Sequence, residues 1–177
     1  PLEGVGAEIT GVDLKALSRA EETAIRDAFA EQGVIFFRDQ SLSEEDHIAF
    51  AQRFGQINVN RFFAAHPDYP QIAMVAKDVG DTDNIGGGWH TDHSYDEIPA
   101  LGSVLVAREL PKTGGDTRFA SMYRAYETLP DELKRAVEGK RAIHSARHIF
   151  GGQDDSYYSQ SDAGRGRIGN ADAVETL

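Results

Sequence analysis

The sequence predicts a mixed α/β fold in which two capped helices precede a strand-rich second half. Two observations predict the helices: apolar residues recur at helical spacing behind Ser18 and again behind Ser43. A third observation, short apolar or alternating runs from residue 71 onward, predicts the strands. No internal repeat is visible. We expect residues 1–177 to form a single domain, because a chain of this length can bury a sizeable core.

The first predicted helix begins after Ser18, whose hydroxyl can accept a hydrogen bond from a free N–H of the first turn. Ile25 and Phe29 lie on its apolar face, and Gly33 is a common residue at a helix end. The apolar run 34–37 that follows predicts a buried strand.

The second predicted helix begins after Ser43 and carries the acidic residues 44–46 in its first turn, where the helix dipole favours negative charge. Gly55 lies beyond its end. We expect both helices to pack on the sheet through their apolar faces.

The rest of the chain reads mainly as strands, with one further helical stretch at 123–137 that Pro130 interrupts. The predicted strands are 71–76, 89–95, 101–108 and 141–145. Residues 151–172 are poor in apolar side chains, so we expect a flexible loop or a lid there.

Composition excludes several classes of protein. The formal net charge of −11 argues against a nucleic-acid surface, which needs clustered Lys and Arg. No apolar run approaches the length of a membrane span, and the expected location is the cytoplasm. The sequence leaves the oligomeric state open and allows a homo-oligomer. Because there is no Cys, a metal site would have to use His and carboxylate ligands.

His90 and Asp92 are the strongest candidates for metal ligands. Side chains alternate along a strand, so two residues separated by one position point to the same face. Two His and one carboxylate with open positions form the ligand set of non-heme Fe(II) oxygenases, and this pair supplies two of the three. An isolated His-x-Asp also occurs by chance in ordinary strands, so its neighbours must decide.

Seven short motifs surround this pair and follow one another through most of the chain. They are 6–14 (GAEITGVDL), 33–40 (GVIFFRDQ), 51–55 (AQRFG), 89–92 (WHTD), 109–111 (ELP), 113–117 (TGGDT) and 125–130 (AYETLP). In this order they resemble the Fe(II)/2-oxoglutarate-dependent taurine dioxygenase family, which includes alkylsulfatase-type and phenoxyacetate-type enzymes.

The resemblance implies a double-stranded β-helix, a cupin-like jelly roll with flanking helices, incomplete at the C-terminus. It implies that His90 and Asp92 bind Fe(II) and that Thr117 hydrogen-bonds the distal carboxylate of 2-oxoglutarate. Members of the family take a third ligand, a His, and an Arg for 2-oxoglutarate from later strands. Residues matching these are absent from the sequence, so we expect the chain as given to be inactive.

The implied reaction uses O₂ and couples decarboxylation of 2-oxoglutarate, which yields succinate and CO₂, to hydroxylation of a small organic acid.

In the taurine-type pattern a His and a Tyr hold the sulfonate, whereas Asn60 and Phe63 occupy the matching positions here. Phe62, Phe63 and Phe150 could line a more apolar pocket, suited to an aryloxyalkanoate or an alkyl sulfate ester, or could simply pack in the core. Trp89 and Phe150 are candidates for apolar side chains that exclude water beside the metal.

The other histidines have simpler interpretations. His93 should point to the opposite face of its strand, in a packing role or behind the ligands. His47 is expected on a helix surface and His66 in an exposed loop. His144 and His148 are weak candidates for the third ligand.

Two other functions remain open at this stage. Residues 90–93, His-Thr-Asp-His, match the last four positions of the His-x-His-x-Asp-His signature of binuclear zinc hydrolases. Gly88 occupies the position of the first His of that signature. A non-catalytic jelly-roll binding module is the second alternative, because a scaffold does not determine function. The glycine run 86–88 lacks the Lys and Ser/Thr of a phosphate-binding loop, so we discount that function.

Overall fold

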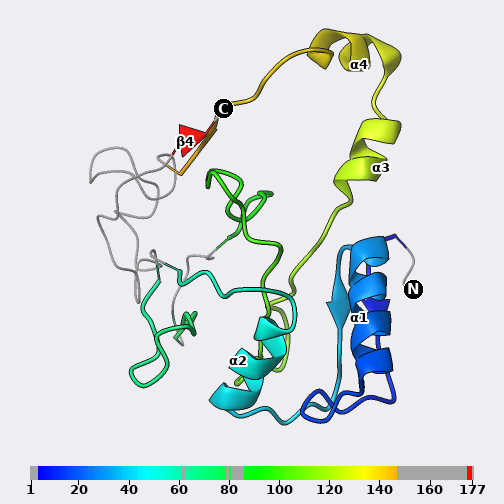
Figure 1. Cartoon of the computed structure of the whole chain (residues 1–177). Coiled ribbons are helices and arrows are strands. Elements are labelled where there is room, and N and C mark those ends of the chain that lie inside the picture. The colour runs from blue at the N-terminus through cyan, green and yellow to red at the C-terminus, as the bar shows by residue number, and fades with distance from the viewer. Residues whose placement is uncertain (1–3, 61–62, 79, 81–85, 147–174, 177) are drawn as a thin grey trace. The chain divides into compact units, whose positions relative to one another are not determined.

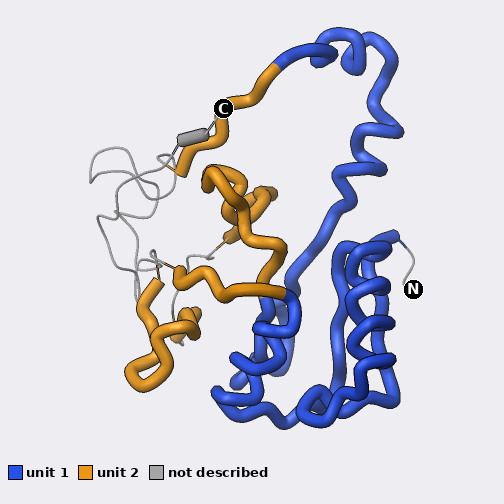
Figure 2. Tube along the Cα trace, in the orientation of Figure 1, with its two compact units in different colours: residues 1–54, 104–140 blue, residues 55–103, 141–177 orange. Residues whose placement is uncertain are grey.

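The computed structural model describes residues 4–60, 63–78, 80, 86–146 and 175–176. It divides into two compact units, shown in different colours in Figure 2. Unit 1 comprises Pro1–Phe54 and Val104–Lys140, and unit 2 comprises Gly55–Ser103 and Arg141–Leu177. Among the described residues, no helix is both long and apolar enough to cross a membrane. The expected flexible segment 151–172 lies outside the described residues.

Helix α1, Arg19–Gln32, confirms the first predicted helix together with both of its ends. The Glu21 N–H donates to Ser18 Oγ at 3.3 Å, and the Ser18 N–H donates to the Glu21 carboxylate at 2.8 Å. This reciprocal pair satisfies two N–H groups that no helical carbonyl can reach. At the other end, Gly33 has a φ of 72° and donates its N–H to the Phe29 carbonyl, a conformation that glycine adopts without steric cost.

Strands β1, Ala7–Glu8, and β2, Ile35–Phe36, pair in parallel, with Ala7 opposite Ile35. The predicted strand 34–37 is therefore confirmed in a shorter form, but it is partly exposed and not buried as expected. A Cβ added at Gly6 would lie 3.1 Å from the Val34 carbonyl oxygen, so the absence of a side chain there lets the two backbones approach. Figure 1 shows α1 lying alongside this strand pair.

Helix α2, Glu44–Gln52, confirms the second predicted helix, and Ser43 and Asp46 form a second reciprocal cap. Its buried residue Phe50 belongs to the core of unit 1, whose other members are Leu14, Ile25 and Leu42. Phe37 and Phe54 contact the Phe50 ring edge-on, with centroids 5.7 and 5.4 Å away.

His47 differs from the prediction of a helix-surface residue. Its Nε2 donates to the Val104 carbonyl oxygen at 2.9 Å, and the side chain is only partly exposed. Arg108 makes a similar contact with the chain before α2, donating to the Leu42 carbonyl at 2.6 Å. These bonds attach the segment 104–108 to α2 within unit 1, a long-range contact that helical periodicity cannot reveal.

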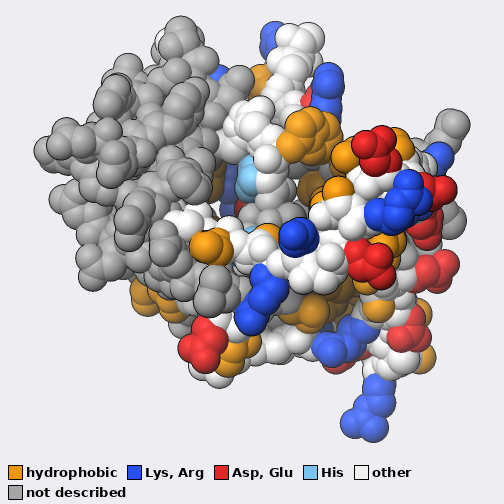
Figure 3. All heavy atoms as spheres, turned by 90° about the horizontal axis from the view of Figure 1, so that it is seen from above, with side chains coloured by type: hydrophobic (Ala, Val, Ile, Leu, Met, Phe, Trp, Pro, Cys, Tyr) orange, Lys and Arg blue, Asp and Glu red, His pale blue; other side chains and the backbone are white. Residues whose placement is uncertain are grey.

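The remaining elements are short. Helices α3, Met122–Glu127, and α4, Asp131–Val137, confirm the stretch interrupted by Pro130, which is the N-cap of α4. Strand β3, His144–Ser145, pairs antiparallel with β4, Glu175–Thr176, and Ala65 forms an isolated bridge to Ala73. In Figure 3, hydrophobic side chains reach the surface between acidic and basic ones.

Two predicted strands are wrong in this structure. Residues 101–108 carry no strand, and residues 89–95 form irregular backbone followed by a turn. Of the predicted strand 71–76, only the bridge at Ala73 forms. A strand takes its hydrogen bonds from a neighbouring strand, so an alternating pattern alone does not produce one. In the described residues these segments have no such partner beyond that bridge.

We expect Ser18→Ala to lower the free energy of unfolding by about 1 kcal/mol, the typical loss when a helix cap is removed. Chemical denaturation followed by circular dichroism measures the change. Ser41→Ala, at an exposed position outside the helices, is the matched control. The loss should also depend on pH, because hydrogen bonds from the Ser18 side chain and backbone lower the pKa of Glu21.

A carboxylate with a lowered folded-state pKa stabilises the fold above its unfolded pKa and loses that contribution as the pH falls through the lowered value. The stability difference between the wild type and Ser18→Ala should therefore be complete at neutral pH and shrink through that acidic range. A difference that grows on acidification would contradict the assignment.

Candidate functional site

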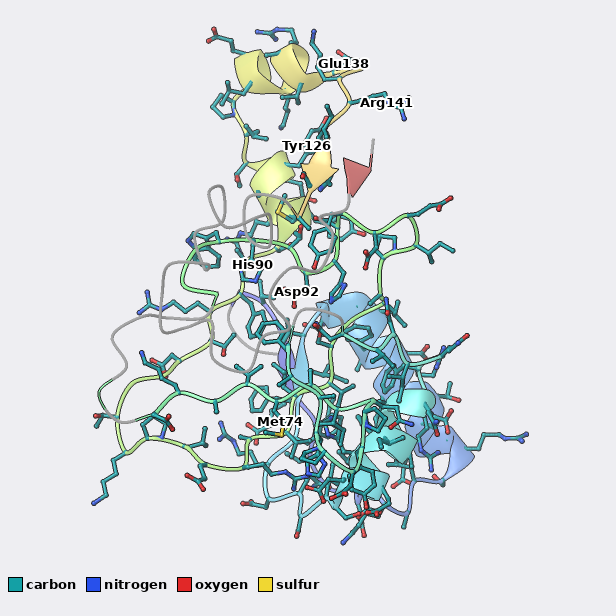
Figure 4. All side chains as sticks on the ribbon, turned by 90° about the vertical axis from the view of Figure 1, so that its left-hand side faces the viewer. Met74, His90, Asp92, Tyr126, Glu138 and Arg141 are labelled. Atoms are coloured by element: carbon teal, nitrogen blue, oxygen red, sulfur yellow. The ribbon has the colours of Figure 1, made fainter. Side chains whose placement is uncertain are left out.

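His90 and Asp92 converge in unit 2. Nε2 of His90 lies 3.1 Å from Oδ1 of Asp92, and both side chains are more than half exposed. Figure 4 labels both residues and shows them side by side. The sequence therefore identifies a pair that the structure brings together.

The reason for this convergence differs from the predicted one. Residues 89–91 are irregular, and Asp92 begins a turn that runs to Tyr95. The Asp96 N–H donates to the His93 carbonyl at 3.0 Å, and His93 has a φ of 54°. The carboxylate therefore approaches the imidazole from irregular backbone that ends at the first residue of a turn, and not through the alternation of a strand.

The contact of Nδ1 of His90 determines which nitrogen of the ring carries the proton. Nδ1 lies 2.7 Å from the carbonyl oxygen of Gly88. A carbonyl can only accept, so Nδ1 carries the proton and donates it. In the neutral ring, Nε2 is then left with its lone pair directed at Asp92. A backbone carbonyl that fixes the tautomer in this way is the usual partner of a metal-binding His.

The donor atoms fit a divalent cation. An Nε2 lone pair and a carboxylate oxygen repel each other at 3.1 Å unless a proton or a cation lies between them. Two neighbouring ligands in an octahedral shell with bonds of about 2.1 Å are themselves about 3 Å apart. Within the described part of the chain, no third His, Asp or Glu joins the pair to complete a cluster.

Gly86 is a site residue that sequence reasoning missed. A Cβ placed on it would lie 3.2 Å from Cε1 and 3.8 Å from Nε2 of His90, and its φ is 69°. The backbone of Gly86 therefore borders the edge of the imidazole that faces Asp92. The glycine run 86–88 was the available signal, because close approach of backbone to a functional side chain is one of the reasons for glycine.

The remaining predicted residues occupy varied positions. Asn60 and Phe63 are partly buried in unit 2, where the Phe63 N–H donates to Asn60 Oδ1 at 3.1 Å. Trp89 is 75% exposed, so within the described residues it does not shield the pair from water.

Thr117 is exposed and belongs to unit 1. Phe62, His148 and Phe150 lie outside the described residues, and His144 is exposed on β3.

His93 and His66 are more engaged than the sequence suggests. The prediction placed His93 on the opposite face of a strand, but the residue lies in a turn. Its Nδ1 lies 2.9 Å from the Asp96 carboxylate, and its Nε2 lies 3.5 Å from Asn60 Nδ2. His66 does lie in a loop, but it is only partly exposed and its ring contacts Tyr69.

Comparison with known proteins agrees with the geometry. The family model described as "Taurine catabolism dioxygenase TauD, TfdA family" matches residues 1–175. The chain belongs to this family. One relative is the (S)-phenoxypropionate/alpha-ketoglutarate-dioxygenase of Sphingobium herbicidovorans, 35% identical over 168 residues, a match that covers 93% of this chain and 55% of the relative.

Solved structures support the TauD/TfdA assignment. The crystal structure of a putative alpha-ketoglutarate-dependent taurine dioxygenase from Burkholderia xenovorans aligns with a TM-score of 0.71 and 35% identity, covering 82% of this chain and 54% of that one. The structure of AAD-2 in complex with Mn(II) and N-oxalylglycine aligns with a TM-score of 0.60 and 26% identity, covering 82% and 51%. The chain thus spans about half the length of the relatives it matches.

We expect Gly86→Ala to weaken binding of a divalent cation on the order of tenfold, because the new methyl group displaces the oriented His90 imidazole. Isothermal titration of the protein with Mn(II) measures the affinity. Gly80→Ala, in the same unit, is the matched control, since its φ is 101° and an added Cβ there meets nothing within 4 Å. Gly114→Ala, with a φ of 79° and open space, separates backbone strain from contact with the ring. Equal affinity in all three variants would disprove the role of Gly86.

Proposed function

We propose that the protein is a non-heme Fe(II)- and 2-oxoglutarate-dependent dioxygenase that hydroxylates a small organic acid and releases succinate and CO₂. The observation that carries this proposal is the His90–Asp92 pair, 3.1 Å apart, with His90 oriented by the Gly88 carbonyl. Membership of the TauD/TfdA family and the Mn(II) complex of a structural neighbour support it. We further propose that the complete catalytic core is the double-stranded β-helix implied by the family.

Separate residues of this chain would bind the metal and the cosubstrate. His90 and Asp92 would hold the metal from one face and leave its other positions open. Bound iron, with 2-oxoglutarate and O₂, would supply the oxidising chemistry. Gly88 keeps the proton of His90 on Nδ1, so that Nε2 remains a ligand. Thr117 is proposed to hydrogen-bond the distal carboxylate of 2-oxoglutarate.

For the substrate we propose an organic acid larger and less polar than taurine, such as an aryloxyalkanoate or an alkyl sulfate ester. Asn60, Phe63 and Phe150 are the proposed substrate neighbours. Asn60 carries no charge and Phe63 has no hydroxyl, so a buried sulfonate would lose partners at a cost of about 1–3 kcal/mol each. The relative that is named for phenoxypropionate supports the aryloxyalkanoate.

Anaerobic addition of Fe(II) and 2-oxoglutarate to the full-length protein should produce the weak visible charge-transfer band of the chelate. His90→Ala and Asp92→Ala should abolish this band and the release of succinate, because each removes a ligand. Asp68→Ala, an exposed carboxylate of the same unit, is the control and should leave both signals unchanged. Wild-type iron affinity and turnover in His90→Ala would refute the proposal, and Zn(II)-dependent hydrolysis without the band would favour the hydrolase.

Thr117→Ala separates cosubstrate binding from metal binding in the same experiment. It should keep the affinity for Fe(II) and raise the half-saturating 2-oxoglutarate concentration about two- to tenfold, since one neutral hydrogen bond contributes roughly 0.5–1.5 kcal/mol. Thr113→Ala, also exposed in the same segment, is the matched control.

A substrate panel tests the proposed specificity. We expect phenoxyalkanoates and alkyl sulfate esters to stimulate 2-oxoglutarate consumption more strongly than taurine, because the two polar contacts for a sulfonate are replaced. The comparison uses kcat/KM for each compound, with substrate-free decarboxylation subtracted. If taurine gave the highest kcat/KM, the proposed substrate class would be wrong.

A further inference from the structure

The backbone of His93 adopts a conformation that needs support. Its φ of 54° is in the left-handed region, and among the described non-glycine residues only Asp39 shares a positive φ. For a residue with a Cβ this conformation is less stable than the right-handed one, because the Cβ lies too close to the following carbonyl oxygen. His tolerates it better than most residues, but neighbouring contacts must still offset the cost.

Asp96 supplies two of these contacts. Its backbone N–H donates to the His93 carbonyl at 3.0 Å, and its carboxylate accepts from Nδ1 of the His93 ring at 2.9 Å. The two side chains are only 17% and 10% exposed, which contrasts with the open His90–Asp92 pair. A hydrogen bond to a carboxylate is among the stronger ones, and shielding from water strengthens it further.

Asn60 supports the other edge of the ring. Because an ionised carboxylate only accepts, Nδ1 of His93 carries the proton, and Nε2 of the neutral ring is an acceptor. Asn60 Nδ2 approaches it at 3.5 Å, a long contact, while Asn60 Oδ1 accepts the Phe63 N–H at 3.1 Å. The ring also lies 5.6 Å from that of Tyr95. Within unit 2, His93 thus joins Asn60 to the turn at 92–96, although the two are far apart in sequence.

Asp92 is the first residue of this turn. The peptide that leaves Asp92 ends at the left-handed His93, so contacts that hold His93 in place also anchor the backbone from which the Asp92 carboxylate projects. We propose that His93, held by Asp96 and Asn60, is a positioning residue for the metal site and orients Asp92. His90 has its own local support in Gly88, and this bracket of Asn60, His93 and Asp96 provides the equivalent support for Asp92.

The inference rests on the proposed function only in taking Asp92 as a metal ligand. Its first test is therefore made without metal, by hydrogen exchange of the backbone amides at 92–97 in the full-length protein. Asp96→Ala and His93→Gly should speed exchange in this segment at least tenfold, while the amides of α1 and α2 exchange as in the wild type. Asp96→Asn retains an acceptor oxygen and should exchange nearly as slowly as the wild type.

The second test measures Mn(II) affinity by electron paramagnetic resonance in the same variants. Asp96→Ala and His93→Gly should bind Mn(II) on the order of tenfold more weakly, the effect usual for residues that orient a ligand, and Asp96→Asn should recover most of the affinity. His93→Gly is informative because glycine adopts the left-handed backbone freely, so it removes the ring without adding strain. Asp68→Ala is again the control.

The outcomes separate the two proposals. If the wild type binds no Mn(II), the proposed function fails while the exchange experiment still tests the bracket. If His93→Gly exchanges and binds Mn(II) like the wild type, the ring positions nothing and the inference is overturned. Should Asp96→Ala fail to fold, Asn60→Ala, which removes the long contact to the His93 ring and the bond to Phe63, must still weaken Mn(II) binding measurably. Wild-type affinity in Asn60→Ala would also overturn the inference.

Discussion

Burial of Phe50 is the interaction on which the architecture of unit 1 depends. Its side chain is 4% exposed. Its ring makes T-shaped contacts with the ring of Phe37, directly after β2, and with the ring of Phe54, just beyond the end of its own helix. Phe29 of α1 in turn contacts Phe54 edge-on. One aromatic chain therefore connects α1, α2 and the residue after β2. Arg26 and Arg53 add polar contacts at the rim, where Arg26 donates to the Arg53 carbonyl and Arg53 pairs with Glu22.

Unit 2 is built on a different principle. Among its described residues, Ala146 is the only buried hydrophobic side chain, and hydrogen bonds that involve the backbone connect its segments, such as those from the His66 N–H to the Ile72 carbonyl and from the Phe63 N–H to Asn60 Oδ1. Each such bond contributes roughly 0.5–1.5 kcal/mol. Both candidate ligands lie here, and each depends on a short-range polar contact for its orientation: His90 on Gly88, and the turn that follows Asp92 on His93 and Asp96. The precision of the site therefore rests on a few individual bonds, so single substitutions should affect it more than they affect the fold.

Family membership and local geometry contribute separate information about function. The match over residues 1–175 defines the family, and the structure brings His90 and Asp92, the two candidate ligands, within 3.1 Å of each other. The relatives extend well beyond the matched region. The activity of the whole protein is therefore a proposal, and the geometry of the two candidate ligands His90 and Asp92 supports it.

The sequence by itself determined the features whose causes are local. Ser18 and Gly33 delimit α1, Ser43 begins α2 and Pro130 separates α3 from α4, because each acts on backbone groups within one helical turn. The motif around residues 89–92 likewise identified both candidate ligands. Tertiary structure alone decided the long-range contacts: the attachment of His47 to Val104 and the joining of Asn60 to His93. It also replaced the expected strand at 89–95 by a turn, because strand formation requires hydrogen-bonding partners from elsewhere in the fold, which no periodicity in a single segment can supply.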